Sequence, residues 1–206
     1  RKGKLYLNRE TWLYDCKRCG EHGGRKTLLD HFGDADDLAY VPGSDPAVRR
    51  RILTKAALLA HDMLLGNDRV MEYLLGRGLS PETIVEAQLG FVPKNVSLSR
   101  SIEGDFKPAD LLSAGLITAG GTEFFNDSIT IPYLSHNSVV QLREKKIDGK
   151  YRTTIDDDVR LYNADTIRDA THVFITEGEF DALMVQQAFR ESSDPTLRAT
   201  AVVGIP

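Results

Sequence analysis

Residues 172–185, HVFITEGEFDALMV, combine an apolar run, an acidic turn and a helical pattern. The apolar run Val173–Ile175 predicts a buried strand of a parallel sheet, because a strand that is covered on both faces shows no alternation. The turn around Gly178 comes next, and the apolar positions after it recur at helical spacing. Strand, turn and helix make half of a βαβ unit, in which ligands bind beyond the carboxyl ends of the strands.

Two carboxylates lie at the ligand edge that this pattern predicts. Glu177 falls at the carboxyl end of the strand, and Asp181 follows one helical turn later, so both can face the same site. Gly178 has no side chain, which leaves room for a close approach of the backbone. Carboxylate oxygens suit a hard divalent cation such as Mg²⁺. The alternative is an acidic surface turn without a chemical role.

The residues of this turn, TEGEFDA at 176–182, resemble the first motif of the Toprim fold. Toprim domains occur in DnaG-type primases, topoisomerases, recombination-mediator proteins and some nucleases. The resemblance implies that Glu177 is catalytic and acts at a magnesium (or manganese) site. Asp181, one helical turn later, is near enough to join the same metal or to orient a water on it, so it is expected to be a supporting catalytic residue. The resemblance also implies a later Asp-x-Asp pair, which would follow the strand that residues 201–204 match.

The N-terminal segment contains the two cysteines, Cys16 and Cys19, in a CxxC arrangement. Residues 5–7 and 11–14 are expected to form two short strands, and residues 26–32 a short helix. A tight knuckle after a hairpin can present two thiolates to one Zn²⁺. A redox pair is one alternative, although such a pair is expected after a long buried strand within a βαβ pattern. Two unligated structural cysteines are another.

Residues 5–33 resemble the second half of the zinc ribbon at the start of DnaG-type primases, in which a hairpin leads into Cys-x-x-Cys-Gly and an apolar helix. A ribbon needs a second pair of ligands. That pair would lie before Arg1, or His22 and His31 would complete the site. The sequence therefore predicts a partial zinc ribbon over residues 1–37.

Residues 1–26 carry eight basic and three acidic side chains, whereas the whole chain has a net charge of −4. Trp12, Lys17 and Arg18 belong to this basic segment. Positive charges attract phosphates and aromatic rings stack on bases, so the segment is expected to bind single-stranded nucleic acid. The alternative is a solvated basic hairpin.

The composition of the 206 residues is ordinary for a globular protein, with 41% hydrophobic and 27% charged residues. No apolar run reaches the length of a membrane span, and no segment resembles a signal peptide. Two cysteines without a secretory signal favour a reducing, cytoplasmic location. Because the sequence begins without Met and ends on a strand pattern, the chain is expected to be a fragment of a longer protein.

Polar residues with two proline-containing turn signals predict a linker over residues 38–50. Helical periodicity then covers residues 49–66 and 70–79. Ser80 followed by Pro81 predicts the N-cap and first residue of a further helix. The middle of the chain is therefore expected to begin with a series of helices.

Residues 73–93 resemble the start of the RNA-polymerase domain of DnaG-type primases, in which a "YL-x-x-RGL" helix pair leads to "LGFAP". The corresponding segments are YLLGRGLS at 73–80 and LGFVP at 89–93. The "AGL" and "FPI" segments of the family occur in the same order, as SAGLI at 113–117 and ITIPY at 129–133. The ordered set extends the resemblance over nearly the whole chain.

Residues 105–170 are expected to form a small, largely β subdomain before the Toprim-like strand. In the family, basic residues of this subdomain line a groove for template and nucleotide phosphates, and the resemblance places Arg143, Lys150 and Arg160 at such positions. The segment FNDS at 125–128 departs from the family pattern, which has arginines there. Ordinary surface charge is the alternative for the basic residues.

The resemblance implies a multidomain protein of the α+β and α/β classes. A partial zinc ribbon (1–37) and a linker (38–50) would precede the helical and β subdomain of a primase RNA-polymerase domain (51–170). The start of a Toprim parallel-sheet domain (171–206) would come after it. The implied function is RNA primer synthesis on single-stranded DNA during DNA replication, by a nucleotidyltransferase that uses Zn²⁺ and Mg²⁺ (or Mn²⁺).

The implied partners are a DNA template, ribonucleoside triphosphates and a replicative helicase, with no membrane. A Toprim nuclease or topoisomerase is an alternative that would use the same acidic centre, but it would lack the zinc ribbon and the helices around residues 73–93. A non-catalytic nucleic-acid-binding accessory protein is the other, if the chain is complete. The fragment alone is expected to be inactive, because one or two carboxylates cannot hold a pair of metal ions.

Overall fold

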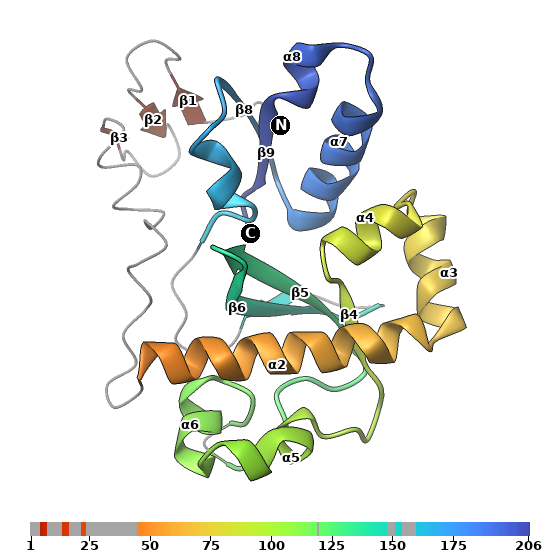
Figure 1. Cartoon of the computed structure of the whole chain (residues 1–206), viewed down its shortest axis with the longest axis vertical. Coiled ribbons are helices and arrows are strands. Elements are labelled where there is room, and N and C mark those ends of the chain that lie inside the picture. Colours follow the sequence, from red (N-terminus) through yellow and green to blue (C-terminus); the bar gives the residue numbers. More distant parts are fainter. Residues whose placement is uncertain are drawn as a thin grey trace.

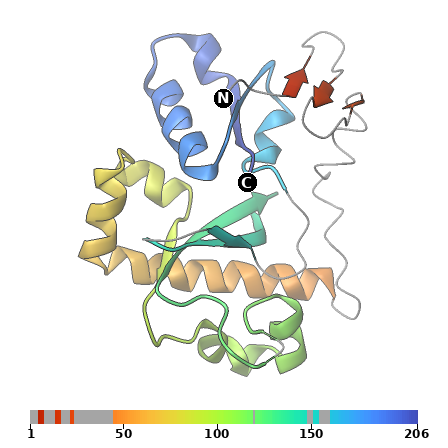
Figure 2. The same ribbon diagram turned by 180° about the vertical axis from the view of Figure 1, so that it is seen from behind.

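The structure is a computed structural model that describes residues 5–7, 14–16, 22–23, 45–118, 120–147, 151–153 and 160–206. The strands within these residues form three separate sheets, and a long helix, α2 (Pro46–Leu65), runs along the central one (Figures 1 and 2). Among the described helices, none is both long enough and apolar enough to span a membrane.

The N-terminal sheet consists of three short antiparallel strands, β1 (Leu5–Leu7), β2 (Tyr14–Cys16) and β3 (His22–Gly23). The first predicted strand is confirmed. Of the second, predicted over residues 11–14, only Tyr14 is among the described residues, and it belongs to β2. The predicted helix at 26–32 lies outside the described residues, and so does the predicted linker up to residue 44.

Helix α2 begins earlier than its periodicity indicated. Asp45 is its N-cap, and the carboxylate accepts a hydrogen bond from the backbone N–H of Ala47 at 2.8 Å. Pro46 occupies the first helical position, where proline has a suitable φ and its missing N–H is not needed. Asp45-Pro46 is therefore a helix start and not a turn of the linker, and residues 46–50 belong to the helix.

The next two helices, α3 (Asp68–Gly76) and α4 (Pro81–Glu86), confirm the predicted helical series. The side chain of Asn67 caps α3 by accepting a hydrogen bond from the N–H of Val70 at 3.1 Å. Ser80 caps α4 in the same way, since its Oγ accepts from the N–H of Thr83 at 3.2 Å. The cap predicted at Ser80 is confirmed.

The central sheet has four antiparallel strands in the order β4-β5-β6-β7. Its strands are β4 (Gly90–Val92), β5 (Ser128–Ser135), β6 (Ser138–Lys145) and β7 (Tyr151–Thr153). The chain between β4 and β5 contains two short helices, α5 (Leu98–Ile102) and α6 (Pro108–Ser113). The β subdomain predicted for 105–170 is thus helical or irregular before residue 128, and its sheet takes its first strand from residues 90–92.

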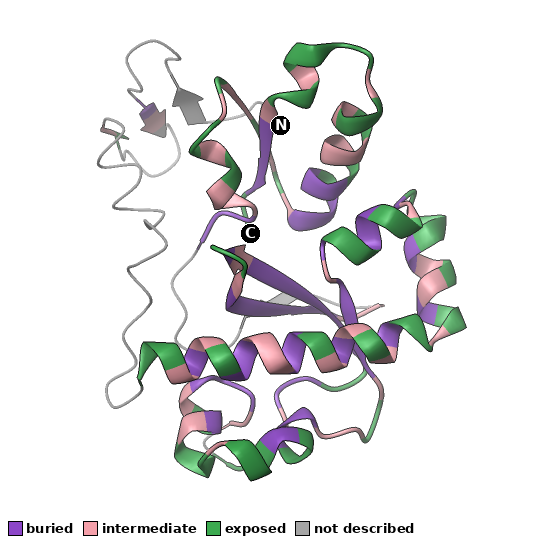
Figure 3. Ribbon diagram, in the orientation of Figure 1, coloured by how far each residue is buried: buried purple, intermediate pink, exposed green. Residues whose placement is uncertain are grey.

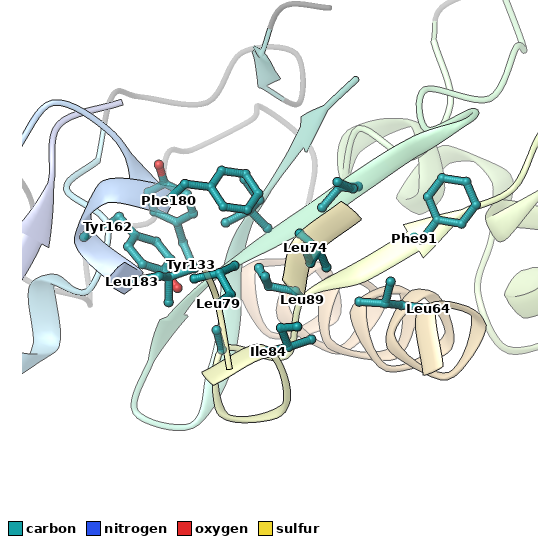
Figure 4. Close-up of a cluster of buried hydrophobic side chains, with 14 of the residues drawn as sticks. Leu64, Leu74, Leu79, Ile84, Leu89, Phe91, Tyr133, Tyr162, Phe180 and Leu183 are labelled. Atoms are coloured by element: carbon teal, nitrogen blue, oxygen red, sulfur yellow. The ribbon is translucent and has the colours of Figure 1, made fainter. Parts of the chain in front are cut away.

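Both faces of the central sheet are covered, although antiparallel sheets commonly leave one face to solvent. Val139 and Leu142 join the buried face of α2 on one side. Ile131 and Tyr133 belong to a second cluster, which the helices α3, α4 and α7 (Glu179–Glu191) complete (Figure 4). Strands β5 and β6 are accordingly buried along almost their whole length (Figure 3).

The C-terminal unit confirms the predicted strand, turn and helix. Strand β8 (His172–Thr176) pairs in parallel with β9 (Thr200–Gly204), and α7 and the short helix α8 (Pro195–Arg198) connect them. The prediction that β8 is buried on both faces is wrong, because Phe174 is 46% exposed. Within the described part of the chain β9 is the only strand that pairs with β8, so β8 lies at the edge of a two-stranded sheet.

Gly90 allows α2 and the central sheet to approach closely. A Cβ on Gly90 would lie 2.7 Å from the carbonyl carbon of Ala60 and 2.4 Å from the Oγ1 of Thr130. Gly90→Ala should therefore lower the free energy of unfolding by about 1–3 kcal/mol, which urea denaturation would measure. Gly76→Ala is the control, since a Cβ there would meet no atom within 4 Å. Equal stability of the two variants would contradict the close packing at Gly90.

Candidate active site

The turn between β8 and α7 places both predicted catalytic carboxylates on the surface. Strand β8 ends at Thr176, Glu177 and Gly178 form the turn, and α7 begins at Glu179. Glu177 is exposed, and so is Asp181 in the first turn of α7. The helix begins directly at the turn, which is the condition under which both carboxylates can face one site.

Hydrogen bonds hold the backbone on both sides of this acidic turn. The Oγ1 of Thr176 shares its one hydroxyl proton between the carbonyl oxygens of Gly178, at 3.0 Å, and Val203, at 3.2 Å. The N–H of Ile205 donates to the carbonyl oxygen of Thr176 at 3.0 Å, and the N–H of Ala182 donates to that of Gly178 at 3.0 Å. The turn is therefore tied to the end of β9 as well as to its own helix.

The close approach of backbones near the turn depends on Gly204, the last residue of β9. A Cβ on Gly204 would lie 2.8 Å from the carbonyl oxygen and 2.9 Å from the carbonyl carbon of Gly178. A Cβ on Gly178 itself would meet no atom within 4 Å. The backbone approach that the sequence predicted at Gly178 therefore requires the absence of a side chain at Gly204, and not at Gly178 itself, within the described part of the chain.

A buried polar cluster lies directly behind the acidic turn. The Oε1 of Glu179 accepts hydrogen bonds from the Nη1 of Arg143 at 2.5 Å and from the hydroxyl of Tyr133 at 2.7 Å. The side chain of Glu179 is 2% exposed and that of Arg143 is 10% exposed. Burial, together with the nearby Glu179 carboxylate, raises the pKa of Tyr133. Its hydroxyl therefore remains a neutral donor at physiological pH.

The C-terminal half of α7 is attached to the connection between α3 and α4. The Oε1 of Gln187 accepts hydrogen bonds from the N–H of Ser80 at 2.8 Å and from the Oγ1 of Thr83 at 2.9 Å. Arg190 forms an ion pair with Glu86 and also donates to the Oγ1 of Thr83 at 2.8 Å. Helix α7 is thus held at both ends, by the central sheet near the turn and by α4 further along.

Arg77 is an exposed cation close to α7 that sequence analysis did not single out. Its guanidinium carbon lies 4.9 Å from the centre of the Phe180 ring and 5.9 Å from that of Tyr73. Phe180 belongs to the first turn of α7, so the guanidinium of Arg77 lies against that turn of the helix. Arg77 belongs to the segment at 73–80 that sequence analysis quoted, but its contact with α7 is visible only in the structure.

Carboxylate oxygens are ligands of the kind that a hard divalent cation prefers, and Glu177 and Asp181 are exposed carboxylates at this turn. Among the residues that the structure describes, no three His, Cys, Asp or Glu side chains are grouped so that they could hold a metal ion. The predicted zinc ligand Cys16 is the last residue of β2, whereas Cys19 lies outside the described residues. His22 begins β3, and His31 is also outside the described residues.

The residues predicted to bind nucleic acid fall into two groups. Arg143 and Arg160 are buried, with 8% and 7% of their surfaces exposed. The others lie outside the described residues: Trp12, Lys17, Arg18 and Lys150. A buried guanidinium offers little surface to a DNA strand, so contact between the template and these two arginines stays a prediction.

A basic hollow of about 630 Å³ lies along the first half of α2. Arg50, Arg51 and Lys55 line it, and Lys55 is paired with Asp105. The guanidinium carbon of Arg51 lies 5.6 Å from the centre of the Phe106 ring. The lining residues include none of the predicted catalytic, metal-binding or nucleic-acid-binding residues.

Several solved primase structures have a fold similar to that of this chain. An Aquifex aeolicus primase structure, with zinc-binding and RNA polymerase domains, is 21% identical with a TM-score of 0.62, over 100% of this chain and 57% of that chain. The RNA polymerase domain of Mycobacterium tuberculosis DnaG was solved in complex with a double-stranded DNA oligomer with a 6-nucleotide overhang. It is 18% identical, with a TM-score of 0.65, and the match covers 79% of this chain and 55% of that chain. A DnaG primase catalytic domain bound to single-stranded DNA is 14% identical with a TM-score of 0.61, over 78% and 56%.

No family model and no curated protein matches the chain. The chain has the fold of DnaG-type primases, a mixed α and β arrangement with several small sheets. It spans about 57% of the length of the Aquifex aeolicus primase chain. The resemblance that the ordered motifs predicted is confirmed at the level of the fold.

Proposed function

We propose that the protein is a DnaG-type primase that synthesises RNA primers on single-stranded DNA. The observation that carries this proposal is the exposed acidic turn at the carboxyl end of β8, within a fold that is similar to primases over the whole chain. Two of the similar proteins were solved with single-stranded or double-stranded DNA, which supports a nucleic-acid template. Ribonucleoside triphosphates would be the substrates, and a replicative helicase the partner in the cytoplasm.

The chain's own residues would perform three tasks in this reaction. Glu177 and Asp181 would hold Mg²⁺ (or Mn²⁺) at the edge of the parallel pair, together with the later carboxylates of the Toprim pattern. The bound ion would stabilise negative charge on the phosphoryl group that is transferred. The exposed guanidinium of Arg77 would attract the triphosphate toward the acidic turn. The hydrogen bonds of Thr176 would keep the turn in place during the reaction.

The test of this function is the incorporation of labelled ribonucleotides on single-stranded DNA by the full-length protein with Mg²⁺. Short RNA products that depend on the DNA template are the expected result. Cleavage of the DNA without incorporation would replace the proposal by a nuclease. DNA binding without either reaction would replace it by an accessory protein.

We further propose that Cys16 and Cys19 are zinc ligands in a ribbon that contacts the template together with Trp12, Lys17 and Arg18. Residues 1–206 alone should hold Zn²⁺ weakly, because the cysteine pair supplies two of four ligands. The full-length protein, purified without chelator, should contain one tightly bound Zn²⁺ per chain, measured by mass spectrometry of the metal content. Serine at both cysteine positions should abolish this binding, and a zinc-free full-length protein would contradict the ribbon.

The salt dependence of DNA binding tests the predicted phosphate contacts of Lys150 and Arg160. Each contact with single-stranded DNA contributes roughly 0.7 to the slope of log K against log salt concentration. Alanine at either position should reduce the slope by roughly this amount and weaken binding about equally for all sequences. Arg168→Ala is the control. An unchanged slope for both variants would show that these residues do not contact phosphates.

A further inference from the structure

Glu179 and Arg143 form a buried ion pair. Apolar side chains at these two positions could stabilise the fold to a similar extent. Removing two charges from water is costly, and buried pairs can often be replaced by apolar residues without loss of stability. Tyr133, which donates to Glu179, and Phe180, which follows Glu179 in the chain, belong with Leu183 to a buried hydrophobic cluster (Figure 4). The pair therefore calls for an explanation other than stability.

What the ion pair adds to the contact is direction. A charge-assisted hydrogen bond restricts the distance and the angle between its partners, whereas apolar side chains can slide past one another. The Oε1 of Glu179 accepts two such bonds, from Arg143 and from Tyr133. The two donors are also joined, since the Nη1 of Arg143 lies 3.3 Å from the hydroxyl of Tyr133. Because they stand on the paired strands β5 and β6, the Glu179 carboxylate is held against a buried sheet.

Glu179 is the first residue of α7, and the two predicted catalytic residues, Glu177 and Asp181, lie two residues before and after it. A rotation or a shift of the first turn of α7 would therefore move both carboxylates. We propose that Arg143, Glu179 and Tyr133 form a latch that sets the position of the Glu177 carboxylate, so that Arg143 and Glu179 are positioning residues. The effect of the latch on catalysis rests on the proposed function. Its effect on the position and mobility of the turn at residues 176–182 does not.

This role of Arg143 differs from the phosphate contact that its sequence position implied. Its Nη1 donates to Glu179 and only 10% of its side chain is exposed. A positioning residue leaves the salt slope of DNA binding unchanged, whereas a phosphate contact lowers it by roughly 0.7 on removal. The two roles are thus separated by one measurement.

The central experiment replaces both charges in the full-length protein, as Arg143→Met with Glu179→Leu. The double variant removes both charges of the Arg143–Glu179 pair, so it is expected to fold with little change in melting temperature. We expect kcat for primer synthesis to fall about 100-fold, as for a misplacement of reacting groups by about 1 Å, with KM for nucleotide and the salt slope unchanged. The matched control is Arg190→Met with Glu86→Leu, which removes the exposed ion pair of the same helix and should leave kcat unchanged.

Amide hydrogen exchange of residues 176–182 provides a readout that needs no activity. Exchange there should be faster in the double variant than in the control, at equal overall stability. If the unmodified protein makes no primers, the proposed function fails, and the exchange rates alone decide the latch. If the double variant does not fold, Tyr133→Phe, which removes one hydrogen bond, should lower kcat about fivefold and speed the same exchange. Unchanged exchange, unchanged kcat or a reduced salt slope would overturn the latch.

Discussion

Replacement of Glu177 by Gln in the full-length protein is expected to lower the rate of primer synthesis by roughly 100-fold or more. Gln keeps the size of the side chain but removes the negative charge that would hold a divalent cation at the end of β8. The loss of one group that stabilises charge in a transition state typically costs about 100- to 1,000-fold in rate. The measurement is the incorporation of labelled ribonucleotides on single-stranded DNA, at saturating Mg²⁺ and nucleotide.

The same variant should fold normally and bind DNA nearly as well as the unmodified protein, because Glu177 is exposed. Asp181→Asn should reduce the rate less, since its role is supporting. Glu191→Gln is the matched control, as it removes an exposed carboxylate from the other end of α7 and should have no effect. Full activity of the Glu177→Gln protein would disprove the catalytic role of the acidic turn.

Breaking the buried ion pair from one side only is expected to cost stability rather than catalysis alone. Arg143→Met leaves the carboxylate of Glu179, whose side chain is 2% exposed, without its cationic partner. Removal of one partner from such a pair typically destabilises a protein by about 3–5 kcal/mol, because an uncompensated charge remains buried. Urea denaturation should show this loss for Arg143→Met and for Glu179→Leu. The double replacement should recover most of it.

The exposed ion pair between Lys55 and Asp105 supplies the control for this comparison. Its side chains are 44% and 53% exposed, so Lys55→Met should change the free energy of unfolding by less than about 1 kcal/mol. A similarly small effect of Arg143→Met would mean that the Glu179 charge reaches water in the folded protein. Additive losses in the double replacement would mean that the two charges do not depend on each other.

The elements that sequence analysis located well are those with local signals. The cap at Ser80, with Pro81 behind it, determined the start of α4, because a side chain and a neighbouring N–H decide it. The apolar spacing after Gly178 likewise indicated α7. The start of α2 was missed at Pro46, since the same Asp-Pro pair can form either a turn or a cap. Which of the two forms depends on how the residues after Pro46 pack in the folded protein.

The sequence by itself determined that an acidic turn ends an apolar strand and opens a helix. That result comes from residues within about one helical turn of one another, whose spacing is visible in the chain. Only the tertiary structure decided what supports the turn. Arg143 and Glu179 are 36 residues apart in the sequence, and Gly204, at the end of β9, packs on Gly178 in the turn. Such contacts depend on how the sheets and helices pack, which is why only the structure shows that Arg143, a residue that the family resemblance assigns to a DNA groove, is buried behind the turn.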